Sequence, residues 1–162
     1  MDFYEAVVVE YLRADRALFV NTECCIQLNE GDNPDTSGPH WYSDAVVCDF
    51  RDRQIFLCEI TFSLSLAALM KRLAGWNSNW SLVQLALKRD SHLPSDWPVR
   101  PWLFVPELLI PPLLKKMDLF VGGLSFTPLI TPLEMAQPWR YRSWNRVGEA
   151  DKPESIPIAM QR

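Results

Sequence analysis

The stretch His40–Ser63, HWYSDAVVCDFRDRQIFLCEITFS, decides the fold of this 162-residue chain. Two runs rich in β-branched and aromatic residues, Trp41–Phe50 and Gln54–Phe62, flank a short charged segment. This pattern predicts a β-hairpin with a polar turn. If the turn is centred between positions 51 and 52, Asp44 lies directly opposite Glu59 on the neighbouring strand.

Both faces of the predicted hairpin are largely apolar, which is typical of strands covered on both sides in a mixed α/β fold. Asp44 and Glu59 lie among hydrophobic residues on one of these faces. Like charges opposite each other on a sheet are destabilising, and buried carboxylates need a positive partner. Mg²⁺ would supply one, because it binds oxygen ligands and commonly uses only one or two protein carboxylates.

Two alternatives remain open for these acids. A register slip of one residue would place the two side chains on opposite faces of the sheet. In the other alternative, Asp44 precedes the strand and is simply solvated.

Length and composition predict a single domain over residues 1–162. Hydrophobic residues make up 48% and charged residues 22%, an ordinary composition for a globular protein. No apolar run reaches membrane-spanning length, and the N-terminus begins with an acidic rather than a basic segment. We therefore expect a cytoplasmic protein without a membrane span.

Charge and residue usage narrow the classes of function. A net charge of -4 and a pI near 5.2 provide no global field for a polyanion, so a nucleic-acid partner would need a local basic patch or a metal ion. The four cysteines do not form paired CxxC motifs and are interpreted as buried free thiols. With two histidines and no nucleophile-elbow serine, a Ser/His/Asp triad is unsupported.

Before the hairpin, the sequence predicts a helix and a strand. Apolar residues at helical spacing indicate a helix over residues 2–17, which Asp2 can cap. Glu5 lies beside the apolar stripe and can face a site on the sheet, or it is a solvated acid favoured by the helix dipole. A strand is expected over residues 18–28, with Glu23 and its alternate neighbours on one face.

After the hairpin, the sequence predicts a second helix and another strand. Ser63 or Ser65 can cap the helix, and residues 75–79 either bend it or break it in two. A strand follows over residues 99–105, where Pro101 indicates an edge position or a late start to the pairing.

The C-terminal third is rich in proline and tryptophan, and its pattern fades from position 118 onward. Its cluster WRYRSW, residues 139–144, interleaves arginines with aromatic residues. Such a cluster can stack on bases and grip phosphates, or it can pack a tail onto its own domain.

The order helix, strand, hairpin, helix, strand, with Asp44 and the tripeptide Glu59-Ile60-Thr61 on adjoining strands, resembles the PD-(D/E)XK nuclease superfamily. The resemblance covers about residues 3–106, which it implies to be the core, and it leaves about 107–162 as a C-terminal extension. It implies a restriction-endonuclease-like αβββαβ core, a mixed central sheet flanked by helices. It also implies that Asp44 and Glu59 bind Mg²⁺ or Mn²⁺, with Glu5 on the first helix assisting.

The sequence departs from the family pattern at one position. The lysine of the E-x-K tripeptide is replaced by Thr61, which cannot supply a positive charge to the reaction. Some family members place the catalytic side chain on the following helix instead. Lys71 is the expected substitute, with Arg72 behind it, and the alternative is that Lys71 is a solvated lysine on a polar helix face.

The resemblance implies a metal-dependent nuclease that hydrolyses phosphodiester bonds of nucleic acid, with DNA favoured over RNA. Asp44 and Glu59 would hold the metal, Lys71 would position water or stabilise charge, and Thr61 would hydrogen-bond nearby. The alternative is a catalytically inactive nuclease-fold module that serves in binding or assembly. In that case the tryptophan-rich C-terminal third would be a protein interface, such as that of a homodimer.

Overall fold

The computed structural model describes residues 2–29 and 39–138. The elements in chain order are α1 (Phe3–Ala14), β1 (Leu18–Gln27), β2 (His40–Asp49), β3 (Gln54–Ile60), α2 (Ala67–Ser78), α3 (Trp80–Ser91), β4 (Val99–Val105), η1 (Glu107–Leu109), α4 (Ile110–Met117), β5 (Leu129–Pro132) and η2 (Leu133–Met135). The predicted cluster at residues 139–144 and the rest of the predicted extension after it, residues 145–162, lie outside the described residues.

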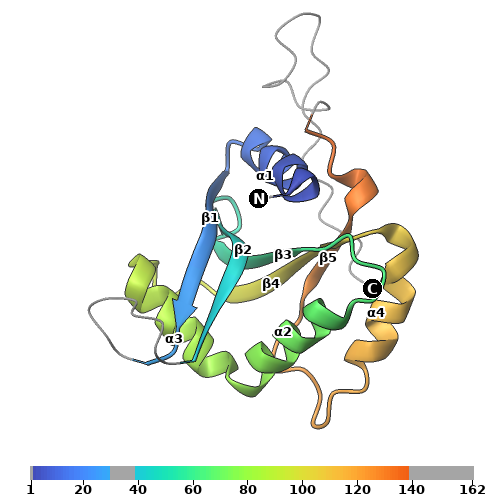
Figure 1. Ribbon diagram of the computed structural model, residues 1–162. Helices are drawn as coiled ribbons and strands as arrows, with labels where there is room; N and C mark the ends of the chain where they lie inside the picture. The colour runs from blue at the N-terminus through green and yellow to red at the C-terminus, as the bar shows by residue number, and fades with distance from the viewer. Residues whose placement is uncertain (1, 30–38, 139–162) are drawn as a thin grey trace, which may run out of the picture.

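A five-stranded mixed sheet forms the centre of the described structure, in the order β1-β2-β3-β4-β5. The pairs β1–β2 and β2–β3 are antiparallel, whereas β3–β4 and β4–β5 are parallel. Helix α1 covers one face of the sheet, and α2, α3 and α4 cover the other (Figure 1). The predicted α/β class with a mixed, helix-flanked sheet is confirmed.

The hairpin has the register that the sequence predicts. Asp49 pairs with Gln54 and Ala45 pairs with Cys58, so one further step places Asp44 opposite Glu59. The turn is stabilised by Asp49, whose Oδ1 accepts a hydrogen bond of 2.8 Å from the backbone N–H of Arg51. A register slip is thereby excluded.

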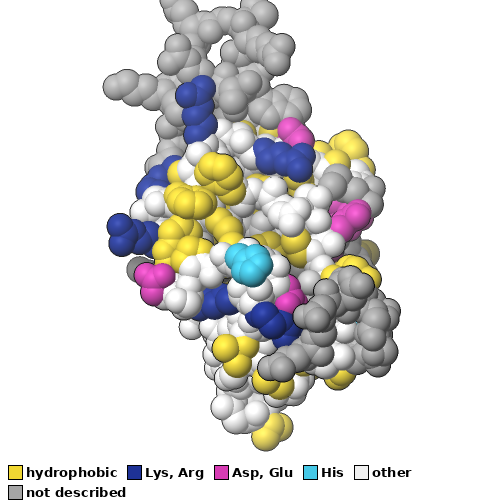
Figure 2. All heavy atoms as spheres, turned by 90° about the vertical axis from the view of Figure 1, so that its left-hand side faces the viewer, with side chains coloured by type: hydrophobic (Ala, Val, Ile, Leu, Met, Phe, Trp, Pro, Cys, Tyr) yellow, Lys and Arg dark blue, Asp and Glu magenta, His cyan; other side chains and the backbone are white. Residues whose placement is uncertain are grey.

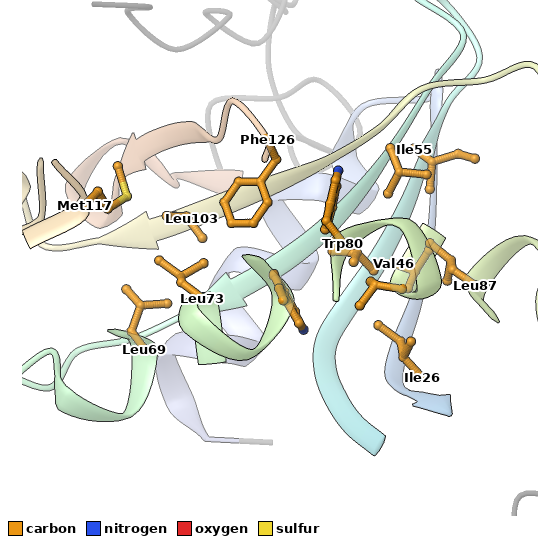
Figure 3. Close-up of a cluster of buried hydrophobic side chains, with 14 of the residues drawn as sticks. Ile26, Val46, Ile55, Leu69, Leu73, Trp80, Leu87, Leu103, Met117 and Phe126 are labelled. Atoms are coloured by element: carbon orange, nitrogen blue, oxygen red, sulfur yellow. The ribbon is translucent and has the colours of Figure 1, made fainter. Parts of the chain in front are cut away.

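Two hydrophobic cores hold the layers together. The larger core joins α2, α3 and α4 to the sheet, and side chains from the helices and from the strands meet between the two layers (Figure 3). Its fully buried members include Leu73, Trp76 and Leu103. The smaller core lies under α1 and includes Val8, Leu12 and other residues that alternate with the first set along the strands.

The side-chain alternation of β1 and β2 reverses next to Asp44. In β1, Val20 packs on the α1 side, but Ile26, an even number of positions later, packs in the core under α2 and α3. Glu23 lies between them with a φ of 56°, in the left-handed region that non-glycine residues rarely adopt. The predicted single face through Glu23 is therefore wrong, because this residue turns the strand over.

Other differences have equally local causes. The helix after the hairpin breaks at Asn79 into α2 and α3, which is one of the two predicted outcomes. Neither serine is its N-cap, a position held by Leu66. Strand β4 is not at an edge of the sheet, because it pairs with β3 on one side and with β5 on the other. Pro101 lies opposite Leu57 of β3, and the pairing with β5 begins only at the next residue. Of the two predicted alternatives, the late start of the pairing is confirmed. Strand β5 was not predicted.

Within the described ranges, no helix is long and apolar enough to span a membrane.

Replacing Ser43 by alanine should test the polar contacts at the reversal. The hydroxyl of this buried residue lies 2.9 Å from the carbonyl oxygens of Ala45 and Cys58, and it can donate to either. Losing it should lower the free energy of unfolding by about 1–2 kcal/mol, measured by urea denaturation. Exposed Ser81→Ala should change it by less than about 0.5 kcal/mol, and an equally small effect at Ser43 would contradict this role.

Candidate active site at the open end of the β2–β3 pair

Asp44 and Glu59 lie one step beyond the last backbone pair of β2 and β3, Ala45 with Cys58. Oδ2 of Asp44 accepts a hydrogen bond of 2.6 Å from the backbone N–H of Ile60. The carboxylate thus lies between the strands at the point where their pairing ends. Asp44 lies where the side-chain alternation of β1 and β2 reverses, so groups from both helical layers can reach it.

Glu59 is buried and paired with a cation from α2. Oε1 of Glu59 accepts a hydrogen bond of 2.9 Å from Nη1 of Arg72, and the side chains are 7% and 31% exposed, respectively. The same nitrogen donates to the backbone carbonyl of Tyr42 on β2. Arg72 therefore ties α2 to both strands of the hairpin, and its guanidinium remains partly accessible to solvent.

Glu5 approaches the two acids from α1. Asp2 and Glu5 form a capping box, in which each side chain accepts a hydrogen bond from the other residue's backbone N–H, at 2.8 and 2.9 Å. The negative charge of Glu5 contributes to raising the pKa of both Asp44 and Glu59. The predicted capping by Asp2 is confirmed, and Glu5 belongs to the acidic surroundings of the site.

Burial shifts the titration of both acids. Desolvation raises the pKa of Asp44 to about 6, opposed by the hydrogen bond from Ile60 and by the charge of Arg72. Desolvation, followed by the charge of Asp44, raises the pKa of Glu59 well above its ordinary value, although Arg72 opposes this. The charge of Asp44 therefore makes it harder to ionise Glu59, and a further cation would relieve this repulsion.

The other predicted site residues have different surroundings. The Thr61 hydroxyl accepts a hydrogen bond of 3.2 Å from the backbone N–H of Ser63, so it contributes to the turn after β3. The side chain of Lys71 is exposed, whereas the guanidinium of its neighbour Arg72 contacts Glu59.

The sequence contained a signal that favoured Arg72 over Lys71. Arg72 is three residues after Leu69 and four before Trp76, both of which are buried, so it borders the apolar stripe of α2. Lys71 lies farther round the helix. Helical phase was therefore the informative feature, and chemical similarity to the missing lysine was not.

The oxygen donors suit a hard divalent cation. In the described part of the chain, the hydrogen bonds to Asp44 and Glu59 engage Oδ2 and Oε1, and each carboxylate has a second oxygen. Two carboxylate oxygens with water in the remaining positions are a common Mg²⁺ environment. Across residues 2–29 and 39–138, no group of three or more His, Cys, Asp or Glu side chains is arranged to hold a metal. Water or substrate would therefore have to complete the coordination.

A pocket of about 160 Å³ lies at the opposite end of the hairpin, lined by residues that include Asp15, Arg51 and Trp102. Nη2 of Arg51 lies 2.8 and 3.0 Å from the two carboxylate oxygens of Asp15. This pair links the α1–β1 connection to the hairpin turn. The two charges of this pair neutralise each other, whereas the Asp44 site has an excess of negative charge.

The pKa of Asp44 predicts how stability should depend on pH. Between about pH 4 and 6 the unfolded chain releases this proton while the folded chain retains it, so the free energy of unfolding should fall as pH rises. Asp44→Asn keeps an acceptor for Ile60 and should stabilise the protein above pH 6 by about 1–3 kcal/mol in EDTA, measured by urea denaturation. Exposed Asp96→Asn is the control, and equal pH profiles for wild type and Asp44→Asn would contradict this assignment.

Two comparisons with known proteins bear on the identity of this site. No protein-family model matches the chain, and no curated protein sequence matches it. What the site can do therefore follows from its residues: two adjacent carboxylates with raised pKa values, one arginine, and an open end of a strand pair.

Proposed function

We propose that this protein is a metal-dependent nuclease with a restriction-endonuclease-like core, and that it hydrolyses phosphodiester bonds of nucleic acid. The observation that carries the proposal is the juxtaposition of Asp44 and Glu59, desolvated together at the open end of the β2–β3 pair. The element order from α1 to β4 and the mixed sheet are compatible with that core.

In this proposal, Asp44 and Glu59 hold Mg²⁺ or Mn²⁺, with Glu5 nearby. When bound, the ion would polarise the phosphate and lower the pKa of a coordinated water. Arg72 takes the role that the family lysine has, and that we first expected of Lys71. Its contacts to Glu59 and Tyr42 use Nη1, and its Nη2 and Nε carry further donors that would bind a phosphate oxygen and stabilise its charge.

The contact between Arg72 and Glu59 also favours a second candidate, a catalytically inactive module that serves in binding or assembly. A guanidinium 2.9 Å from the carboxylate already compensates one buried charge without a metal ion. If this contact only stabilises the fold, the acidic pair has no catalytic role. The response to a divalent cation distinguishes the two candidates.

Substitutions on α2 should identify the cation that acts in cleavage. Arg72→Ala should reduce Mg²⁺-dependent cleavage of an oligonucleotide by about 100-fold or more, because it removes charge stabilisation beside the phosphate. Arg72→Lys should restore part of that activity, and Lys71→Ala should cost less than about tenfold. Rates are measured with a fluorophore-labelled oligonucleotide under single-turnover conditions.

Circular dichroism and urea denaturation of each α2 variant provide the control for folding. A large loss of cleavage with Lys71→Ala and none with Arg72→Ala would reverse the assignment. Absence of cleavage by the wild-type chain on single-stranded and duplex DNA and on RNA would favour the inactive module.

Divalent cations should stabilise the wild-type protein through the acidic pair. Binding to the folded state alone raises the melting temperature as ion concentration increases, and Mg²⁺ or Mn²⁺ at 100 times its dissociation constant adds about 2.7 kcal/mol. Asp44→Asn should remove this response while it stabilises the ion-free protein. Differential scanning fluorimetry with and without EDTA measures both effects, and the same ion response in the variant would exclude Asp44 as a ligand.

A further inference from the structure

Aromatic side chains close in sequence to the acidic residues form a stack whose outer members are exposed. The rings of Tyr4 on α1 and Phe62, just after β3, have centroids 4.0 Å apart and planes within 8° of parallel. Phe3 packs edge-on against Tyr4, with centroids 5.5 Å apart. Phe62 is 51% exposed and Phe3 is 74% exposed. We refer to Phe3, Tyr4 and Phe62 as the Phe62 stack.

The chain connects this stack directly to the proposed catalytic residues. Tyr4 is adjacent to Glu5, whose charge acts on Asp44 and Glu59, and Phe62 is three residues after Glu59. Three extended residues span at most about 10 Å. A nucleic acid with a phosphate at the acidic pair therefore has neighbouring bases within reach of the Phe62 ring.

We propose that the Phe62 stack binds an unpaired base of a single-stranded nucleic acid whose backbone lies at Asp44 and Glu59. The inference rests on the proposed function and specifies its substrate class. Parallel rings present a flat outer surface on which a third planar group can stack, and every base has such a face. In a duplex the bases already stack on one another, so a single strand or an unpaired end is the fitting partner.

Nearby positive charge suits the backbone of the same strand. Arg72 from α2 is 31% exposed where it contacts Glu59, which is three residues before Phe62. Aromatic rings for bases and cationic side chains for phosphates are the two components of single-strand binding sites.

A second aromatic cluster differs in geometry and provides a control. Phe19, Phe50 and Trp97 meet edge-on, with interplanar angles of 64° and 77° at centroid distances of 5.0 Å. Phe19 is 63% exposed and lies on β1 next to the far end of the hairpin. Exposed hydrophobic side chains, bordered by lysines and arginines, also gather on the face that carries β1 and α3 (Figure 2). Edge-on rings offer no extended flat surface to a base.

The test measures binding without cleavage. Fluorescence anisotropy in EDTA compares a single-stranded oligonucleotide, a blunt duplex, and a strand of equal length that lacks bases in its central part. The proteins are Asp44→Asn, which removes one carboxylate and thereby reduces repulsion of the phosphates, and the same variant with Phe62→Leu, Phe62→Trp or Phe19→Leu. Leucine keeps an apolar contact with Tyr4 but removes the flat ring.

We expect Phe62→Leu to weaken single-strand binding about fivefold or more, Phe62→Trp to retain it, and Phe19→Leu to change it less than twofold. The base-free strand should bind weakly to the Asp44→Asn protein, and adding Phe62→Leu should weaken its binding little further. Equal affinity for duplex and single strand, or no effect of Phe62→Leu, would overturn the proposal. The proposal would also fail if Phe62→Leu changed only the oligomeric mass of the protein, measured by analytical ultracentrifugation. That result would assign the stack to contact between copies of this chain.

Failure of this inference and failure of the proposed function give different results. If the protein cleaves duplex and Phe62→Leu does not change its binding, it is a nuclease with another substrate class. A protein that binds single strands through Phe62 but cleaves nothing would keep the stack and lose the catalytic proposal.

Discussion

The structure around the hairpin depends on one electrostatic constraint, two carboxylates held side by side where water is partly excluded. Glu59 is fixed in this position because its strand is central to the sheet and its neighbours belong to the core. Asp44 is fixed because its carboxylate substitutes for the strand ladder by accepting the N–H of Ile60. Neither acid can move away, so the charge of Asp44 raises the cost of ionising Glu59, and the site is completed by positive charge.

The reversal of side-chain alternation explains how one site can draw on both helical layers. On a regular sheet, a side chain faces either α1 or α2, and an acid on one face would not interact closely with charges on the other. At Glu23 the left-handed backbone turns β1 over beside Asp44, so Asp44 interacts with Glu5 from α1 and with Arg72 from α2. Unfavourable backbone conformations of this kind persist where the surrounding structure fixes them, and they are concentrated at functional sites.

The sequence predicted those features that local rules determine. The hairpin register follows from turn position and alternation, and the Asp2 cap follows from side-chain chemistry at a helix start. The reversal was not predictable, because glutamate gives no sign of a positive φ. Strand β5 has only four residues and is bounded by Pro128 and Pro132, which weaken a strand pattern, so only its parallel pairing with β4 defines it. The choice between Lys71 and Arg72 depended on helical phase.

Charge at the site explains why an arginine in contact with a proposed ligand need not disable it. When all are ionised, Asp44, Glu59, Glu5 and Arg72 carry a net charge of about -2, and a divalent cation changes this to about 0. A phosphodiester, which carries one negative charge, would then no longer be repelled. Without the guanidinium, the three acids and the cation would keep a net charge of about -1, which would repel the substrate. Arg72 can therefore neutralise Glu59 in the ion-free protein and still favour substrate binding once a cation is present, so one residue satisfies the requirements of both folding and catalysis.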